Sequence, residues 1–262
     1  MKIPGRALLL ALAVLATGSG ASAQTPAGGD SRRSGFEFMG PSTQAMQKDD
    51  TLNPAMLWVK DGESLWAQPA GQSGKACVAC HAEASSSMRG VAARYPAFDE
   101  RLSRPLTLGQ RINQCRQHHQ QAATLRAESQ QLLSLEAYVA LQSRDLPLAP
   151  PADARLAPFR KQGEQRFLQR MGQLNLSCAQ CHDQNAGGRL GGNLIPQAHP
   201  TGYPVYRLEW QALGSLQRRV RGCMSGVRAE PYAYDAQELV ELELYLTARA
   251  RGMAMETPGV RP

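Results

Sequence analysis

The residues with the clearest chemistry form two copies of the pattern Cys-x-x-Cys-His, at 77–81 and 178–182. This spacing is typical of c-type haem attachment, in which two thiols bond to the haem vinyl groups and the adjacent imidazole coordinates the iron. A zinc site or a thioredoxin-like dithiol is disfavoured, because zinc pairs rarely carry a histidine after each pair and a catalytic dithiol would not be duplicated. We therefore expect two covalently bound haem c groups. The predicted attachment residues are Cys77, Cys80, Cys178 and Cys181, and the predicted iron ligands are His81 and His182.

The two remaining cysteines, Cys115 and Cys223, each lie downstream of their own haem motif, where a small cytochrome supplies its second axial ligand. That ligand is usually Met or His. The candidates of these types have no counterpart in the other half of the chain: Met88, His118, His119, His199 and Met224. A disulfide between Cys115 and Cys223 is an alternative in an oxidising compartment, but it requires the two positions to lie within bonding distance. Thiolate ligation is favoured, and it would stabilise Fe(III) and give both haems low potentials.

An arginine precedes each of these cysteines by four residues: Arg111 before Cys115, and Arg219 before Cys223. On a helix this spacing places the cation on the same face as the thiol, where it lowers the thiol pKa. For Arg111 we favour the alternative of a haem-propionate partner or a solvated charge. Cys223 has the more cationic surroundings, with Arg218, Arg221 and Arg228 also nearby. An uncrowded thiolate with cationic surroundings suits an anionic substrate that contains sulfur.

An internal repeat positions these residues. The haem motif and the Gly-Glu pair before it recur 101 residues later, whereas the Tyr-Pro segment at 95–98 and the segment ending in Cys115 recur 108 residues later. Seven extra residues thus enter the second copy near 185–193, where glycines predict a flexible loop. Each copy closes with a helical stripe that carries a tyrosine, Tyr138 or Tyr245.

The repeat predicts an all-α fold of two tandem cytochrome c-like modules with little or no sheet, in which buried haem compensates for a modest core. We place the modules at residues 54–147 and 159–262, with a proline-rich linker at 148–158 between them. A polar N-terminal extension at 24–53 precedes them and is expected to wrap or extend.

Residues 1–23 have the pattern of a secretory signal peptide, with Lys2 and Arg6 before a short apolar run and Ala-Ser-Ala before Gln24. We therefore expect a periplasmic protein with no membrane span. The formal net charge of the whole chain is +7, and it falls by the two cations of the signal segment on export. This charge favours anionic partners, but the basic residues are dispersed and no nucleic-acid reader motif is present, so nucleic acid is not an expected partner.

Taken together, these residues resemble the SoxA family, the dihaem cytochromes of the periplasmic Sox thiosulfate-oxidising system. The likeness spans nearly all of the mature chain. It is carried by the paired haem motifs, by the segment from Arg219 to Met224, and by the closing segment 245–252.

The resemblance implies that His81 and Cys115 hold the first iron, and that His182 and Cys223 hold the second. It also implies that Cys223 carries a persulfide sulfur and that Arg219 contacts substrate. The implied activity is that of an L-cysteine S-thiosulfotransferase, which couples thiosulfate oxidatively to a cysteine of the SoxYZ carrier. The implied partner is SoxX, a monohaem cytochrome that forms a heterodimer with the chain and receives two electrons.

Two other functions compete with this one. A thiosulfate dehydrogenase would join two thiosulfates into tetrathionate without a protein carrier. A dihaem electron-transfer protein would have no catalytic activity, and its function would survive replacement of Cys223 by Met.

Overall fold

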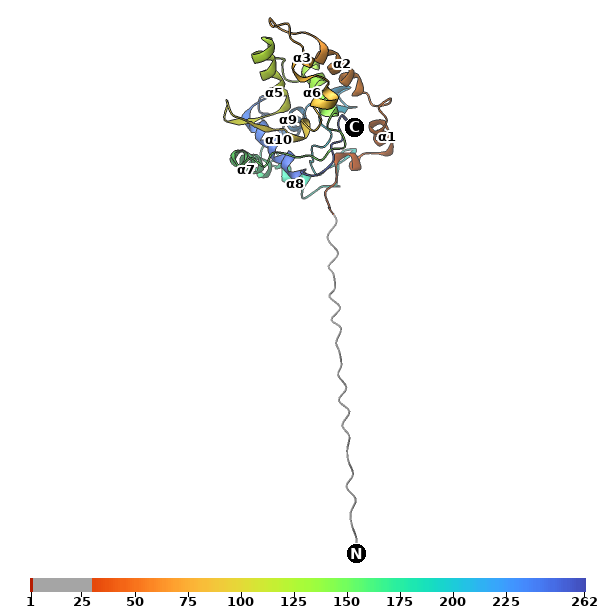
Figure 1. Cartoon of the computed structure of the whole chain (residues 1–262). Coiled ribbons are helices and arrows are strands. Elements are labelled where there is room, and N and C mark those ends of the chain that lie inside the picture. The colour runs from red at the N-terminus through yellow and green to blue at the C-terminus, as the bar shows by residue number, and fades with distance from the viewer. Residues whose placement is uncertain (2–29) are drawn as a thin grey trace. The chain divides into compact units, whose positions relative to one another are not determined.

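The computed structural model describes residue 1 and residues 30–262. The predicted signal peptide, apart from Met1, lies outside the described residues, as does the extension up to residue 29. Residues Arg32–Pro262 form one compact unit, so both halves of the repeat pack into a single body (Figure 1). Among the described residues, every helix is too short or too polar to cross a bilayer.

Helices of the described residues follow the predicted repeat. They are α1 (Pro41–Lys48), α2 (Met56–Ala67), α3 (Val78–His81), α4 (Ala84–Ser87), α5 (Leu108–Cys115), α6 (Gln130–Leu141), α7 (Ala157–Leu168), α8 (Cys178–His182), α9 (Leu216–Gly226) and α10 (Gln237–Arg249). Short 3-10 or π turns occur at η1 (Gly35–Phe38), η2 (Ala92–Arg94), η3 (Arg116–Gln120) and η4 (Ala154–Leu156). The strands are β1 (Ala97–Asp99), β2 (Arg104–Leu106), β3 (Arg189–Leu190), β4 (Asn193–Leu194), β5 (Val205–Arg207), β6 (Ala212–Gly214) and β7 (Gly259–Arg261).

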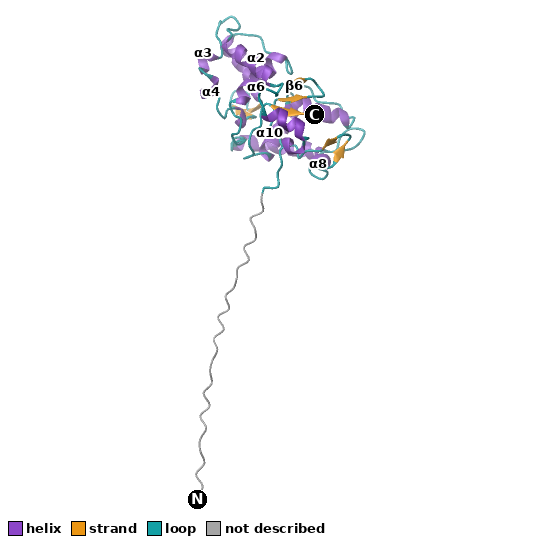
Figure 2. Ribbon diagram, turned by 90° about the vertical axis from the view of Figure 1, so that its right-hand side faces the viewer, coloured by secondary structure: helices purple, strands orange, loops and turns teal. Residues whose placement is uncertain are grey.

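The expectation of an all-α fold holds only in part, because short strands form three small sheets between the helices (Figure 2). β1 pairs with β2, β3 pairs with β4, and β5 lies between antiparallel β6 and parallel β7. The inserted segment predicted as a flexible loop contains the β3–β4 hairpin. Strands of two or three residues are too short to show the alternating pattern that identifies strands in a sequence.

Two helix pairs pack against each other at equivalent places in the two halves, α2 with α6 and α7 with α10. Each pair meets at a glycine of the first helix: a Cβ at Gly62 would collide with the carbonyl of Ser134, and a Cβ at Gly163 with that of Glu241. Each pair also carries an aromatic contact, with ring centroids 6.0 Å apart for Trp66–Tyr138 and 5.4 Å apart for Phe167–Tyr245. The predicted closing helices are therefore confirmed as α6 and α10.

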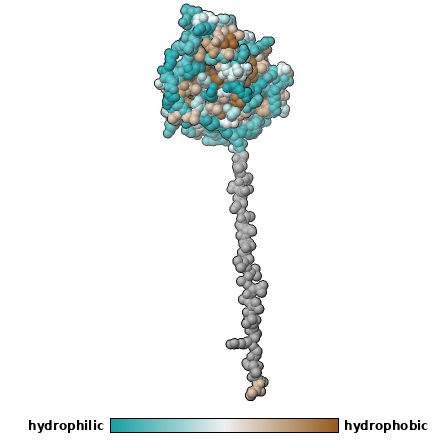
Figure 3. Space-filling view, viewed as in Figure 1, coloured by the Kyte–Doolittle hydropathy of each residue, from teal (hydrophilic) through white to brown (hydrophobic). Residues whose placement is uncertain are grey.

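The hydrophobic core crosses the boundary between the two halves. Val59 and Trp66 of α2 share one buried cluster with Tyr206, Leu213 and Val260 of the β5–β6–β7 sheet. A second buried cluster lies between α7 and α10. The face seen in Figure 3 is hydrophilic around its edge, and apolar residues gather toward its middle.

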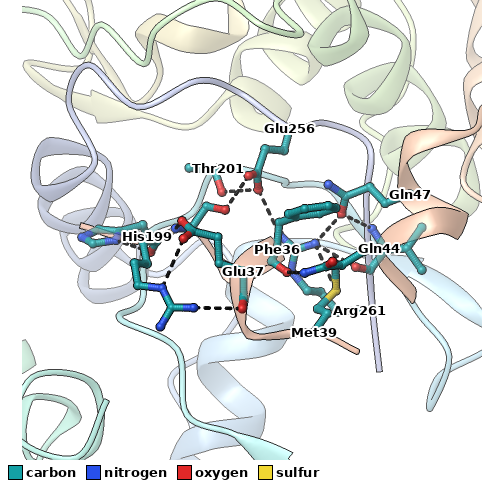
Figure 4. Close-up of polar contacts among 12 residues, drawn as sticks. Phe36, Glu37, Met39, Gln44, Gln47, His199, Thr201, Glu256 and Arg261 are labelled. Atoms are coloured by element: carbon teal, nitrogen blue, oxygen red, sulfur yellow. Dashed lines mark hydrogen bonds and ion pairs between the residues drawn. The ribbon is translucent and has the colours of Figure 1, made fainter. Parts of the chain in front are cut away.

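The described part of the N-terminal extension wraps against residues near the C-terminus (Figure 4). Ser34 donates its hydroxyl hydrogen bond to Glu256, which also accepts a bond of 2.8 Å from Thr201. The guanidinium of Arg261 donates to the side-chain oxygen of Gln47 in α1. The Ser34–Glu256 and Gln47–Arg261 bonds join residues more than 200 positions apart along the chain.

A cavity of about 120 Å³ lies between the two halves and is lined by equivalent residues from each. Among them are two pairs of carboxyl groups related by the repeat, Glu128 with Asp235 and Glu136 with Glu243. Burial raises the pKa of Glu243 to about 8 despite a hydrogen bond from Gln217, and the charges of Asp235 and Glu128 add to the rise. Burial also holds the pKa of Glu136 well above its usual range, and the nearby Glu243 charge adds to this.

These raised pKa values predict that the fold becomes less stable as the pH rises from about 4.5 to about 8. A carboxyl whose pKa is raised on folding stabilises the native state fully below its unfolded pKa, and this contribution is lost as pH rises through the folded value. For Glu243 the loss falls between the ordinary value of 4.5 and about 8. We expect Glu243→Gln to remove a pH dependence on the order of a few kcal/mol over that range, measured by denaturant unfolding. Exposed Glu164 is the matched control, and equal slopes for wild type, Glu243→Gln and Glu164→Gln would contradict the prediction.

Candidate functional site

Each haem motif folds into one helical turn, which brings its side chains together. Ser177 caps α8 by accepting from the backbone N–H of Gln180, and the side-chain oxygen of Gln180 accepts from the backbone N–H of Ser177. This capping box starts the helix at Cys178, so Cys178 and Cys181 lie one turn apart on the same side. In the first half, α3 begins directly after Cys77, but no side-chain capping bond starts this turn.

In the second half, the imidazole of His182 is oriented by a backbone carbonyl. Its Nδ1 lies 2.7 Å from the carbonyl oxygen of Pro196. Because a carbonyl only accepts, Nδ1 must carry the proton, and the lone pair of Nε2 is left for a metal. His182 also contacts Cys223, which comes from α9. An imidazole nitrogen and a sulfur brought together beside two further thiols fit a covalently attached haem with His/Cys ligation.

The thiol of Cys223 lies among positive charges. Burial by itself acts to raise the Cys223 pKa, but a hydrogen bond with His182 opposes it. The positive charges of Arg219 and Arg207 act in the same direction as this bond, and the net result is a Cys223 pKa below the ordinary value. The second site therefore favours a thiolate at Cys223, the form that donates to iron and attacks sulfur.

The first half brings Cys115 to its own motif but in a different electrostatic setting. Cys115 is the last residue of α5. It lies close enough to the first haem motif that the charge of Cys80 acts to raise the Cys115 pKa and the charge of Cys115 acts to raise the Cys77 pKa. Burial raises the pKa of Cys115, and the positive charge of Arg111 only partly offsets this. The ring of His81 lies 5.7 Å from that of Trp66.

The disulfide and zinc alternatives find no support in the described residues. No two of the six cysteines are bridged, and Cys115 and Cys223 lie beside different haem motifs. No group of three or more His, Cys, Asp or Glu side chains within residues 30–262 is arranged to hold a metal ion by itself.

The predicted arginines separate into distinct roles. Arg111 forms an ion pair of 2.9 Å with Asp99, which differs from the propionate or solvated role favoured from the sequence. Arg218 stacks on the ring of Trp210 at 4.2 Å, and Arg221 stacks on Tyr234 at 4.3 Å. Arg219 is the one of the four predicted arginines around Cys223 whose charge is among the main influences on that thiol.

A residue that sequence reasoning missed is Arg207, at the end of β5. It is 7% exposed, and its positive charge acts to lower the pKa of Cys223 in α9. The repeat could have revealed it, because Arg207 follows the matched Tyr-Pro segment where the first copy has Asp99.

The family model described as the SoxA/TsdA cytochrome c domain matches residues 61–148 and 162–255 of the chain. The chain belongs to this family. The SoxA/TsdA match covers both halves of the repeat separately, and it confirms the resemblance drawn from the motifs. Cytochrome c domains carry covalently bound haem c, which agrees with the donor sets described above.

Curated relatives point to the SoxA branch of this family. The chain is 34% identical over 233 residues to the L-cysteine S-thiosulfotransferase subunit SoxA of Pseudaminobacter salicylatoxidans, covering 88% of this chain and 82% of that protein. The protein of the same name from Rhodovulum sulfidophilum is also 34% identical, with coverage of 88% and 81%. The crystal structure of SoxXA from P. pantotrophus matches with a TM-score of 0.85 and 31% identity, covering 88% of this chain and 87% of that one.

Proposed function

We propose that this chain is the catalytic subunit of a periplasmic L-cysteine S-thiosulfotransferase. The reaction joins thiosulfate to a cysteine of the SoxYZ carrier: carrier thiol plus thiosulfate gives carrier S-thiosulfonate, one proton and two electrons. The curated SoxA relatives bear this activity in their names. The observation that carries the proposal is the thiol of Cys223, which lies beside His182 of the second haem motif and whose pKa is lowered by the charges of Arg219 and Arg207.

We assign two haem c groups to the chain, one in each half. Cys77 and Cys80 would bond to the first haem, with His81 and Cys115 holding its iron. The second haem would be bonded by Cys178 and Cys181, with His182 and Cys223 as the iron ligands. When bound, the haems supply acceptors for single electrons.

The protein's own residues hold and orient sulfur. Cys223, as thiolate or persulfide, holds the sulfur during transfer because its surroundings favour the anionic form. Arg219, one helical turn before it in α9, orients the dianionic substrate by charge-assisted hydrogen bonds. The hydrogen bond from His182 to Pro196 keeps the imidazole in one tautomer through the reaction.

We propose a SoxX-type monohaem cytochrome as the heterodimer partner and electron recipient. The support is the likeness to a chain in a structure titled SoxXA. The predicted signal peptide supports assembly in the periplasm.

A product assay tests the proposal. The purified holoprotein with its cytochrome partner, thiosulfate and a carrier with one reactive cysteine should add thiosulfonate to that cysteine, seen in the intact mass of the carrier. The intact mass of the chain should include two haems. Tetrathionate formed without a carrier would instead establish a thiosulfate dehydrogenase, and the absence of both products would favour an electron-transfer protein.

A further inference from the structure

The two halves place opposite charges at the same point of the fold. β1 pairs with β2 so that Asp99 lies opposite Arg104, and β5 pairs with β6 so that Arg207 lies opposite Ala212. Every residue pair of the first hairpin recurs 108 positions later in the second. Asp99 and Arg207 are therefore structurally equivalent, and both are buried, at 3% and 7% exposure.

In the first half, this position neutralises the arginine next to the cysteine. Asp99 lies 2.9 Å from the guanidinium of Arg111, which also donates to Gln114 at 2.8 Å. The cation of the first site is thus occupied by a buried carboxylate of the same chain. An incoming anion would have to displace that carboxylate.

In the second half, the same position adds a cation. The side chain of Arg219 forms no ion pair or hydrogen bond with the residues that the structure describes. Arg207 instead occupies the position equivalent to Asp99, which in the first half lies against the equivalent arginine, so it brings a second positive charge to the surroundings of Arg219 and Cys223. Two guanidinium groups in the surroundings of one sulfur atom repel one another, and a bound anion relieves that repulsion.

The polar contacts of Arg207 involve its Nε and one terminal nitrogen, and its other terminal nitrogen makes no hydrogen bond with the described residues. Its Nε donates to a main-chain oxygen of Pro262 at 2.9 Å, and its guanidinium lies 5.1 Å from the centroid of the Trp210 ring. One terminal nitrogen lies 2.8 Å from Glu209, whose side chain is 65% exposed. An exposed partner of this kind is screened by water and contributes little, so it competes weakly with a bound dianion.

We propose that Arg207 is a substrate-binding residue that, together with Arg219, holds the sulfonate end of the thiosulfate dianion beside Cys223, and that Asp99 removes the equivalent anion site from the first half. This inference rests on the proposed function. Bidentate guanidinium pairing is the favoured way for proteins to bind planar or tetrahedral oxyanions.

The test measures thiosulfate binding to the oxidised holoprotein by calorimetry, and it measures the KM for thiosulfate in the carrier assay. Arg207→Gln should weaken binding and raise KM by about tenfold or more, and Arg207→Lys should recover part of this loss because it keeps the charge. Arg221→Gln is the matched control, since it removes one charge from α9 two residues from Cys223 but its guanidinium stacks on Tyr234. It should change KM by no more than about twofold.

A variant on the surface gives an effect of opposite sign and does not disturb the core. Glu209→Gln should tighten thiosulfate binding by about twofold, because Arg207 loses its competing carboxylate. Equal binding by wild type, Arg207→Gln and Glu209→Gln would overturn the inference. Binding that depends on Arg207 in a protein that never modifies the carrier would leave the anion site standing and refute the proposed function instead.

Discussion

Replacing Cys223 with serine is expected to abolish carrier modification, with a loss of about 10³-fold or more in kcat. A hydroxyl at this position can neither carry a persulfide sulfur nor supply the thiolate that the cationic surroundings stabilise. The measurement is the rate of thiosulfonate addition to the carrier, at a haem content shown to equal that of wild type.

Two further variants show whether the loss belongs to this position. Ser225→Ala changes an exposed residue of the same helix and should leave the rate unchanged. Cys115→Ser makes the equivalent substitution in the first half, where burial raises the pKa of Cys115 and Asp99 occupies the neighbouring arginine. It should cost at least about tenfold less than Cys223→Ser, because the loss of an axial ligand alone does not remove the reacting sulfur. Equal losses in the two cysteine variants would contradict the asymmetry of the sites.

Arg219→Gln and Arg111→Gln should separate function from stability. Arg219→Gln is expected to lower kcat/KM by about 10²-fold, because the charge that orients a dianion beside Cys223 is lost. The free energy of unfolding should change little, since the side chain of Arg219 has no ion pair or hydrogen bond within the described part of the chain.

The opposite outcome is expected for Arg111→Gln. It leaves Asp99, with a side chain only 4% exposed, without its ion-pair partner, and should cost about 1–3 kcal/mol in stability. Its effect on kcat/KM should be several-fold smaller than that of Arg219→Gln. Denaturant unfolding and steady-state kinetics on the same preparations check both variants, and a large stability loss in Arg219→Gln would refute its assignment to substrate.

Local patterns in the sequence determined much of the chemistry. The haem motifs specify their cofactor because two thiols and an imidazole within five residues must share one helical turn, and α3 and α8 show that turn. The repeat predicted the equivalent helix pairs, since the apolar stripes of α6 and α10 follow helical spacing that is visible in the chain. The four-residue spacing of Arg111 and Arg219 from their cysteines also placed these residues on α5 and α9.

Short strands and buried charges could not be predicted in this way. β1 and β5 are too short to show a strand pattern, so the hairpins that place Asp99 and Arg207 were missed. The carboxyl cavity joins Glu136 and Glu243, which are more than 100 positions apart and belong to different halves.

The sequence by itself determined the type of cofactor and the duplication, because each haem motif lies within five residues and the repeat is visible along the chain. It also predicted the cysteine that each half would offer as a ligand. Only the tertiary structure decided which arginine is neutralised and which faces a sulfur with a second cation. Asp99 and Arg207 act on residues that are distant along the chain, and electrostatic interactions depend on separation in space rather than along the sequence.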